Sequence, residues 1–499
     1  MSKVTIQVFD ECNCKIVGLD SNLRRTLNQR FKYEVPGAYH IPSVKLGRWD
    51  GKIAFFQMGG KTFINLLPDI IPVIQQAGYE IDIDDKRQYS VNSLKFEKVD
   101  ERSYSHKSWP EGHPVAGEPI ILRDYQVEII NSFLDNEQGV QEVATGSGKT
   151  LITAILSHKC ENIGRTIVVV PNKSLVTQTE EDYINLGLDV GVLYADRKEF
   201  DKTHTICTWQ SLNNLTKKSF QEKNNITLGE FMDGVVAVIC DECHQAKADI
   251  LKTVLTESMG KVPLRWGLTG TIPKDDLAGA SILSSIGPLL NRVSASDLQD
   301  KGVLAKCNVN VLQLIDIKEF SNYQSELKYL LTNPSRQDYL AKFINNVSES
   351  GNTLVLIDRV SAGKELVDKI NTLNVDKTLD NGELIATFIS GKTNQTERKQ
   401  HYDEIKTSTN KIICATYGVA AVGINIPRIF NLVLLEPGKS FVRVIQSIGR
   451  GIRKSKDKDF VQIWDITSTC KFAKRHLTER KKFYREANYP FTIQKIDWD

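Results

Sequence analysis

The run from Cys240 to His244, Cys-Asp-Glu-Cys-His, places five side chains in a row that can take part in chemistry. The spacing Cys-x-x-Cys-His is used for covalent haem attachment. The same thiols and imidazole are also zinc ligands. A third interpretation treats the cysteines as bystanders and the two acids between them as the reactive groups.

A glycine-bearing loop at residues 144–150, ATGSGKT, opens an apolar helical segment. Backbone N–H groups in such a loop, together with the N-terminus of the helix, hold phosphate oxygens. Lys149 would reach the β- and γ-phosphates of a nucleotide, and the Thr150 hydroxyl would bind Mg²⁺. The general pattern has a glycine five residues before Gly148, where this chain has Val143. We interpret the loop as a nucleotide-binding P-loop; the alternative is a chance glycine-rich turn.

The residues before the acids favour the third interpretation of the 240–244 run. GVVAVICD, residues 234–241, predicts a buried parallel strand with Asp241 and Glu242 at its carboxyl end, where open α/β sheets bind ligands. A P-loop enzyme needs an acid there for Mg²⁺, which fits Asp241, and Glu242 would polarise the attacking water. His244 would signal nucleotide state to a neighbouring segment. Haem attachment implies export, for which no signal is visible, and zinc lacks further paired ligands nearby.

Two further segments have side chains suited to a nucleotide. Arg450 and Arg453 are three residues apart, and Gln446 precedes Arg450 by one turn, so the three share a helix face. Arginines from a facing domain stabilise charge on a transferring γ-phosphoryl group. The alternative is a solvated basic surface. Gln126, in LRDYQ upstream of the P-loop, has the amide donor and acceptor to read an adenine edge.

The elements that must position these residues alternate between strand and helix from about residue 120 onward. Short β-branched runs such as TIVVVP, THTICTW and RWGLTGT are separated by helical segments; the pattern pauses near residues 290–310 and resumes with TLVLID, NKIICATY and NLVLLEP. This alternation predicts two successive α/β domains, each a parallel sheet covered by helices. The first ~95 residues predict a small α+β domain, with Ser21 capping its first helix.

These patterns divide the chain into five segments: an N-terminal α+β domain at 1–100, a linker at 101–118, α/β domains at 119–298 and 299–467, and a basic helix with a tail at 468–499. The linker holds prolines, glycines and two histidines, and we interpret it as solvated chain rather than a metal site. The C-terminal helix carries seven Lys or Arg against two Glu over 468–487. It is interpreted as a DNA contact, with a solvated face or a protein-docking element as alternatives.

The composition is that of a soluble globular protein, with 41% apolar and 25% charged residues in 499. No apolar run is long enough to span a bilayer, so no membrane partner is expected. Nine scattered cysteines indicate a reducing cytoplasm rather than a disulfide framework. The net charge of +3 is too small to indicate a nucleic-acid partner, so any surface that binds nucleic acid must be a local concentration of positive charge. The lack of a heptad pattern favours a monomer.

Seven blocks in the order LRDYQ, ATGSGKT, VVPNKSLVTQ, DECH, LTGT, ATYGVAAVGINIP and QSIGRGIR resemble the superfamily 2 helicases over roughly residues 120–467. The resemblance implies an α/β fold with two tandem RecA-like domains, parallel sheets with helices on both faces, beside the small α+β domain. It also implies ATP and Mg²⁺ as cofactors, with the nucleotide between the two domains and a nucleic-acid strand across them.

The resemblance assigns roles to individual residues of this chain. The residues implied to bind the nucleotide are Arg123, Gln126, Thr145, Gly146, Ser147, Gly148, Lys149, Thr150, Gly423 and Asn425. Those implied in catalysis are Lys149, Asp241, Glu242, Gln446, Arg450 and Arg453, with Thr150 and Asp241 on the metal. Strand contacts are implied at Pro171, Lys173, Thr208, Gln210 and Thr416, and coupling at His244, Thr269 and Thr271. Many relatives have Asp where this chain has Asn425, which leaves the ribose contacts open.

A narrower resemblance joins KLGRWDGKIAFF and LEPGKSFVRVIQSIGRGIRK to the phage recombination helicases of the UvsW type. That family remodels forks, Holliday junctions, displacement loops and RNA–DNA loops. The resemblance implies a branched or single-stranded DNA partner, or an RNA–DNA hybrid, in the host cytoplasm. It makes residues 1–100 an accessory DNA-binding domain with Arg48, Trp49 and Lys52 as contacts, although Trp49 is equally suited to a core position.

Two rival function classes are consistent with the same motor blocks. One is another ATP-driven motor, either an RNA helicase or the translocating subunit of a restriction enzyme. The other is a nucleic-acid-binding protein that uses ATP as a switch and never translocates. Loss of Glu242 or Arg450 would favour a switch, and both residues are present.

Overall fold

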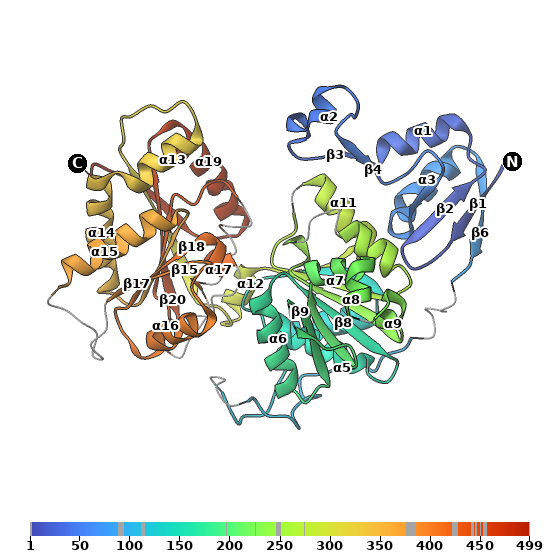
Figure 1. Ribbon diagram of the computed structural model, residues 1–499, viewed down its shortest axis with the longest axis horizontal. Helices are drawn as coiled ribbons and strands as arrows, with labels where there is room; N and C mark the ends of the chain where they lie inside the picture. The colour runs from blue at the N-terminus through green and yellow to red at the C-terminus, as the bar shows by residue number, and fades with distance from the viewer. Residues whose placement is uncertain are drawn as a thin grey trace. The chain divides into compact units, whose positions relative to one another are not determined.

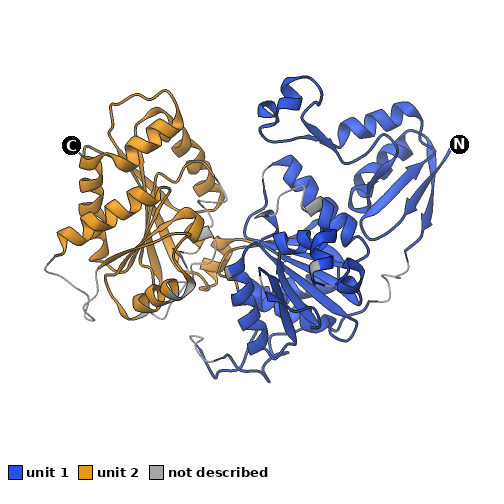
Figure 2. Ribbon diagram, in the orientation of Figure 1, with its two compact units in different colours: residues 1–143, 148–292 blue, residues 144–147, 293–499 orange. Residues whose placement is uncertain are grey.

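The computed structural model describes residues 2–87, 94–110, 115–195, 197–224, 226–245, 251–273, 275–375, 385–421, 428–440, 444, 447–449, 451–452 and 457–498. Two compact units divide the chain. The first comprises residues 1–143 and 148–292, and the second comprises residues 144–147 and 293–499 (Figure 2). Each unit is described by itself.

The N-terminal part of the first unit is a four-stranded sheet in the order β5-β2-β1-β6, in which only β1 and β6 run parallel (Figure 1). Its strands are β1 (Ser2–Val8), β2 (Asn13–Val17), β5 (Lys61–Phe63) and β6 (Tyr79–Asp85). Its helices are α1 (Ser21–Arg30) and α3 (Leu67–Gln76), and a separate hairpin of β3 (Lys32–Glu34) and β4 (Lys52–Ala54) encloses α2 (Pro42–Lys45). The predicted cap at Ser21 was one residue late, because the Asp20 carboxylate accepts the first backbone N–H groups of α1.

The rest of the first unit is an eight-stranded sheet in the order β10-β9-β11-β8-β12-β13-β7-β14. Its strands are β7 (Gln138–Val143), β8 (Arg165–Val170), β9 (Val190–Tyr194), β10 (Arg197–Lys198), β11 (His204–Thr208), β12 (Val235–Asp241), β13 (Leu264–Thr269) and β14 (Leu289–Val293). Its helices are α4 (Asp124–Leu134), α5 (Lys149–Cys160), α6 (Lys173–Asn185), α7 (Trp209–Leu215), α8 (Lys218–Asn224), α9 (Leu228–Met232), the π-helix η5 (Leu251–Ser258) and α11 (Asp276–Ser285). The described pairings from β9 to β7 are all parallel, which explains why these strands are apolar on both faces.

The second unit is a seven-stranded sheet in the order β17-β18-β16-β19-β20-β15-β21, and all six of its pairings are parallel. Its strands are β15 (Lys306–Leu314), β16 (Thr353–Ile357), β17 (Ala386–Ile389), β18 (Ile412–Thr416), β19 (Asn431–Leu435), β20 (Phe460–Ser468) and β21 (Phe491–Ile496). Its helices are α12 (Ala295–Asp300), α13 (Tyr323–Thr332), α14 (Pro334–Ser348), α15 (Val360–Leu373), α16 (Gln395–Thr407), α17 (Tyr417–Ala421) and α19 (Lys471–Glu486).

Helices cover both faces of the second sheet. Ile466 of β20 packs with the apolar residues of α13, α14 and α15. The neighbouring Asp465 faces the opposite side, where Arg480 of α19 binds its carboxylate at 2.8 and 2.9 Å. The predicted fold class, two tandem RecA-like domains beside a small α+β domain, is therefore confirmed.

Two predicted segments are more firmly packed than their composition indicated. The C-terminal tail joins the second sheet, because β21 pairs with β15 from Phe491 to Ile496, so residue 467 is not the end of this unit. The segment expected to be a solvated linker is partly buried: Tyr104 is only 5% exposed, and its hydroxyl lies 2.8 Å from Nδ1 of His158 on α5. Among the described residues, no helix is both long and apolar enough to cross a bilayer.

Candidate nucleotide and strand sites

The P-loop connects β7 to α5 and depends on two glycines with left-handed backbone. Gly146 has φ +90° and Gly148 has φ +86°. A Cβ atom at Gly148 would lie 2.6 Å from the side-chain nitrogen of Gln126, so a larger residue would strain the backbone and displace the end of the Gln126 side chain. Val143, which replaces the usual first glycine, ends β7 with its side chain fully buried. Its carbonyl accepts a hydrogen bond from Lys149 Nζ at 3.3 Å, so this position still serves the loop through its backbone.

Lys149 and Glu242 form a buried ion pair at the carboxyl edge of the first sheet. Lys149 Nζ lies 3.1 Å from Glu242 Oε1, and both residues are less than 10% exposed. Glu242 follows β12 with a left-handed φ of +50°, and its N–H donates to the Asp241 carboxylate at 2.9 Å. Burial opposes ionisation of Glu242, but the charges of Lys149 and His244 and a hydrogen bond from Gly270 N–H outweigh it, and the pKa falls to about 2.

Glu242 touches the loop after β13 directly and lies next to His244: Gly270 N–H donates to Glu242 Oε2 at 3.2 Å, and His244 Nδ1 lies 3.4 Å from the same oxygen. The Thr269 hydroxyl donates to the Thr271 carbonyl at 2.7 Å, so it accepts from His244 Nδ1, which lies 2.6 Å away. Nδ1 therefore carries a proton. Burial lowers the pKa of His244, an effect that the charge of Glu242 opposes and the charge of Lys149 reinforces. The three residues predicted to couple hydrolysis to movement are thus in contact.

The cysteines that flank the acids belong to the core. Cys240 and Cys243 are fully buried among the apolar side chains between the first sheet and its helices. Burial raises the pKa of the Cys240 thiol to about 12 and raises that of Cys243 well above its ordinary value, which disfavours the thiolate form that metals bind. This environment agrees with the acidic-box interpretation of the 240–244 run.

Gln126 reaches the P-loop, but half of its amide is already engaged. Its side-chain oxygen accepts the backbone N–H of Arg123 at 3.0 Å, which caps the start of α4. Its side-chain nitrogen lies beside Gly148. An amide oxygen can accept two hydrogen bonds, so this contact is compatible with the expected use of both donor and acceptor on an adenine edge. Arg123 itself is exposed, and its guanidinium donates to the Tyr125 hydroxyl at 3.0 Å.

The predicted strand contacts lie at the carboxyl ends of their strands. Pro171 follows β8, and Thr208 ends the adjacent β11 opposite Val170. Lys173 opens α6 with its Nζ over the ring of Tyr194, and Gln210 is exposed at the start of α7. The two strand ends are thus brought together at the same edge as the acidic box. Thr416 takes the equivalent position at the end of β18 in the second unit.

The remaining predicted residues are placed elsewhere. Arg48 and Lys52 are exposed near the β3–β4 hairpin, and Trp49 is half-buried with its indole N–H on the Lys52 carbonyl at 3.0 Å. The predicted residues Gly423, Asn425, Gln446, Arg450 and Arg453 lie outside the described residues. The sequence patterns missed Gly270, whose N–H donates to Glu242 Oε2 at 3.2 Å; its only signal was its place between Thr269 and Thr271.

Two sequence families match the chain, one in the eight-stranded sheet of the first unit and one in the second unit. The family described as "Type III restriction enzyme, res subunit" matches residues 119–274, and "Helicase conserved C-terminal domain" matches residues 335–455. These two domains in tandem make the chain an ATP-hydrolysing helicase.

The chain is also similar to individual helicases over most of its length. The chain is 24% identical to the ATP-dependent DNA helicase uvsW of Enterobacteria phage T4 over 93% of this chain and 90% of that protein. It is 22% identical to the DNA 3'-5' helicase XPB of Mycobacterium tuberculosis over 78% of this chain and 68% of that protein. The predicted resemblance to UvsW-type helicases is confirmed.

Solved structures share the fold. The Type ISP restriction-modification enzyme LlaBIII bound to DNA superposes with a TM-score of 0.56 at 15% identity, covering 86% of this chain and 36% of that one. The Mycobacterium smegmatis helicase Lhr bound to single-stranded DNA superposes with a TM-score of 0.52 at 16% identity, covering 74% and 48%.

Proposed function

We propose that this protein is an ATP-dependent DNA helicase or translocase that unwinds or branch-migrates forks, Holliday junctions, displacement loops and RNA–DNA loops. The observation that carries the proposal is the buried pair of Lys149 and Glu242. Glu242 accepts the Gly270 N–H and lies 3.4 Å from His244 Nδ1, and Thr269 links His244 to the Thr271 carbonyl. The similarity to the phage T4 helicase over nearly the whole of both chains supports DNA as the polymer.

In this proposal the ion pair is a switch that ATP opens. Lys149 neutralises Glu242 when no phosphate is present, because Nζ lies 3.1 Å from the carboxylate in a buried site. A γ-phosphate carries more negative charge than one carboxylate and competes for Lys149. Glu242, once released, would accept the proton of the attacking water. The same displacement would disturb the Gly270 and His244 contacts, which transmits nucleotide state to Thr269 and Thr271.

The remaining nucleotide contacts are also proposals, and the described geometry bears on those of Thr150, Asp241 and Gln126. Thr150 and Asp241 fit Mg²⁺, because a hydroxyl and a largely buried carboxylate at a strand end are the oxygen ligands it prefers. When bound, Mg²⁺ would neutralise charge on the β- and γ-phosphates. Arg450, Arg453 and Gln446 are proposed to contact the γ-phosphate, and Gln126, Gly423 and Asn425 the nucleoside.

The DNA path is proposed from the strand ends. Pro171, Lys173, Thr208, Gln210 and Thr416 would contact the phosphates of one strand, so binding would be independent of sequence and weaken as salt rises. Arg48, Trp49 and Lys52 would contact the duplex at the branch. We propose a monomer in the cytoplasm; all nine cysteines are unpaired and buried, which suits a reducing compartment.

The test is the ATPase rate of the full chain without nucleic acid and with single-stranded DNA, a fork, a four-way junction or duplex RNA. Stimulation mainly by the fork and the junction, lost in Glu242→Gln, is the expected result. Stimulation by RNA alone would exclude the DNA proposal and keep the motor. A rate unchanged by every polymer would leave only an ATP-dependent switch.

A strand-displacement assay separates unwinding from translocation without unwinding. The same fork is given hydrolysable ATP or a non-hydrolysable analogue. Release of the strand only with ATP is expected of a helicase. ATP hydrolysis stimulated by the fork but with no strand released would favour the restriction-type translocase.

A further inference from the structure

A surface of the second unit combines aromatic rings with exposed cations, and none of its residues belongs to the motor blocks. It is built from the segment before α13, α13 itself, the loop after β19 and the first turns of α19. We call it the α13–α19 surface, and its residues are Lys318, Phe320, Tyr323, Tyr329, Lys439, Lys471, Phe472, Lys474, Arg475 and His476. All five cations are exposed, and the five rings are half-buried.

The rings hold lysine side chains in fixed positions. Lys318 Nζ lies 4.9 Å from the ring centre of Tyr329 and 5.9 Å from that of Phe320, and the two rings are 5.2 Å apart. Lys471 Nζ lies 5.8 Å from the ring of Phe472. A cation resting on an aromatic face gains about 0.5–1 kcal/mol at an exposed site. Less side-chain entropy is then lost when such a lysine binds an anion.

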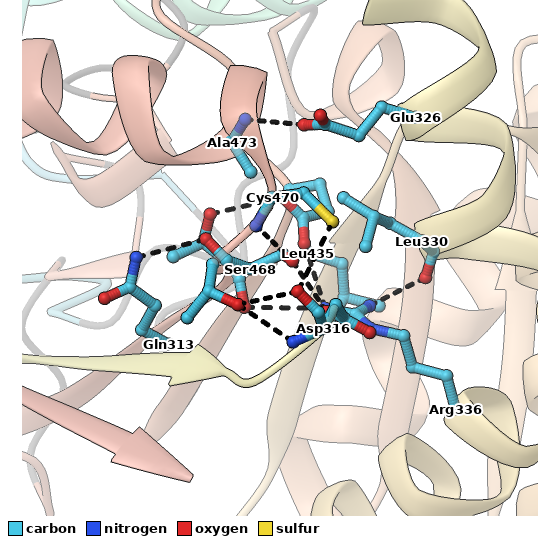
Figure 3. A network of polar contacts seen from close by, with 12 residues as sticks. Gln313, Asp316, Glu326, Leu330, Arg336, Leu435, Ser468, Cys470 and Ala473 are labelled. Carbon is cyan, nitrogen blue, oxygen red and sulfur yellow. Dashed lines mark hydrogen bonds and ion pairs between the residues drawn. The ribbon is translucent and has the colours of Figure 1, made fainter. Parts of the chain in front are cut away.

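The helix beneath the surface is anchored by buried charge (Figure 3). Glu326 of α13 accepts the backbone N–H groups of Phe472 and Ala473 at 3.0 and 2.6 Å, which fastens the start of α19. The Cys470 thiol contacts the carbonyl of Lys318 at 3.3 Å, which ties the two segments together. Arg480, 1% exposed, binds Asp465 from the opposite face of the same helix. The orientation of α19 is therefore fixed, with Lys471, Lys474 and Arg475 turned to solvent.

Most carboxylates near this surface are buried or paired with groups outside it. Glu326 is buried against the start of α19, and Glu479 pairs with Lys482 at 3.0 Å. Glu319 is the exposed acid within the segment before α13. Burial lowers the pKa of His476 to about 4, helped by the charges of Arg480 and Lys439, so this ring is neutral. The surface consequently has a strong positive excess, although the whole chain carries a net charge of only +3.

We propose that the α13–α19 surface binds the sugar–phosphate backbone of DNA at a second site, separate from the strand contacts of the motor blocks. The proposal rests on the proposed function for its choice of polymer. Lys471 and Arg475 are four residues apart on one helix, which is about 6 Å along its axis. That is close to the rise of two base pairs, about 6.8 Å. Cations held on rings and on a fixed helix suit a repeating phosphate ladder and carry no base-specific groups.

The experiment compares two charge-reversal variants of the full chain. One is Lys471→Glu with Arg475→Glu on the surface. The matched control is Lys306→Glu with Lys342→Glu, two exposed lysines of the same unit on β15 and α14. Affinity for a fluorescent duplex and a single strand is measured by anisotropy across a salt series. Thermal unfolding of both variants is measured to show that they fold.

The surface variant is expected to bind the duplex about tenfold more weakly at 100 mM salt than the control does, with a salt slope shallower by about 2. Equal weakening of both variants would overturn the proposal, because it would show an effect of net charge alone. Preserved DNA affinity in the surface variant, with lost binding of a poly-glutamate peptide, would assign the surface to an acidic protein instead. Absence of DNA binding by the unmodified chain would contradict the proposed function itself.

Discussion

Glu242 and Glu436 have the same backbone role in the two units and opposite electrostatic environments. Each directly follows a buried parallel strand, each has a left-handed φ, +50° and +43°, and each is at most 5% exposed. Glu242 faces Lys149, a flexible side chain that can move to a phosphate. Glu436 faces Arg336, which also donates to the Leu330 and Thr467 carbonyls and lies 3.6 Å from Asp316.

The difference separates the carboxylate that we propose acts on water from one that holds the fold together. The pKa of Glu242 is held low by Lys149 against the effect of burial. Burial raises the pKa of Glu436 to about 7, because Asp465 adds to burial and the two nearby arginines, Arg336 and Arg480, do not fully offset it. A left-handed glutamate at a strand end is therefore not by itself a catalytic signature. What distinguishes the two is whether the partner cation is free to leave.

The largest expected effect is on turnover, and it compares the two glutamates directly. Glu242→Gln should lower ATP turnover about 10²–10⁴-fold, because the amide cannot accept a proton from water. Glu436→Gln, the same change in the same backbone conformation, should leave turnover near that of the unmodified protein. Steady-state ATPase assays with saturating DNA make the measurement. A comparable loss in both variants would remove the distinction between the two carboxylates.

The next effect is on stability. Arg336→Met should lower the free energy of unfolding by about 3–5 kcal/mol, because it leaves Glu436 and Asp316 buried without their shared cation. Lys342→Met, on the exposed face of the same helix α14, should change it by less than about 0.5 kcal/mol. Urea unfolding followed by circular dichroism compares the two variants. A loss below about 1 kcal/mol in Arg336→Met would mean that the carboxyl groups are held neutral without the arginine.

The smallest effect is the pH dependence of stability. The pKa of Glu436 rises from about 4.5 in the unfolded chain to about 7 in the folded one. The folded state therefore keeps a proton that the unfolded state releases between these pH values, and stability falls as pH rises through this window. Glu436→Gln should remove that fall, which amounts to about 3 kcal/mol at most.

The measurement is the melting temperature of both proteins from pH 4.5 to 8. The variant should gain on the unmodified chain as pH rises, and the gain should level off above pH 7. Parallel curves would contradict the raised pKa. Glu242 gives the opposite sign: its lowered pKa contributes stability that is present above pH 4.5 and lost as pH falls toward 2.

Much of the fold was predictable because its signals are local. Fully apolar runs between helical segments identified the parallel strands. The Gly-Lys-Thr sequence that opens α5 and the Asp-Glu pair at the end of β12 indicated which edge of the first sheet would bind a nucleotide. Those positions depend only on where a strand stops and which residue follows. The same reasoning gave α19 as a helix, and the structure confirms it over Lys471–Glu486.

The rest depends on contacts between residues distant in sequence. The Lys149–Glu242 pair and the Glu326 cap on α19 each join segments that no short pattern relates. Tyr104 was assigned to a solvated linker because its neighbours are prolines and glycines, yet it packs on His158. Arg480 was counted among surface charges, and it is buried because Asp465 of β20 lies opposite. In neither case does the type of side chain predict that the residue is buried.

The position of β15 in its sheet has a consequence for synthesis on the ribosome. Residues 306–314 pair on one side with β20 at residues 460–468 and on the other with β21 at residues 491–496. This strand therefore emerges long before either partner, with two unpaired edges exposed to other nascent chains. In the first unit β7 also emerges before its neighbours β13 and β14, but these are complete at residue 293. A ribosome that stalls between that residue and β20 would therefore leave the first unit able to fold and the edges of β15 unpaired.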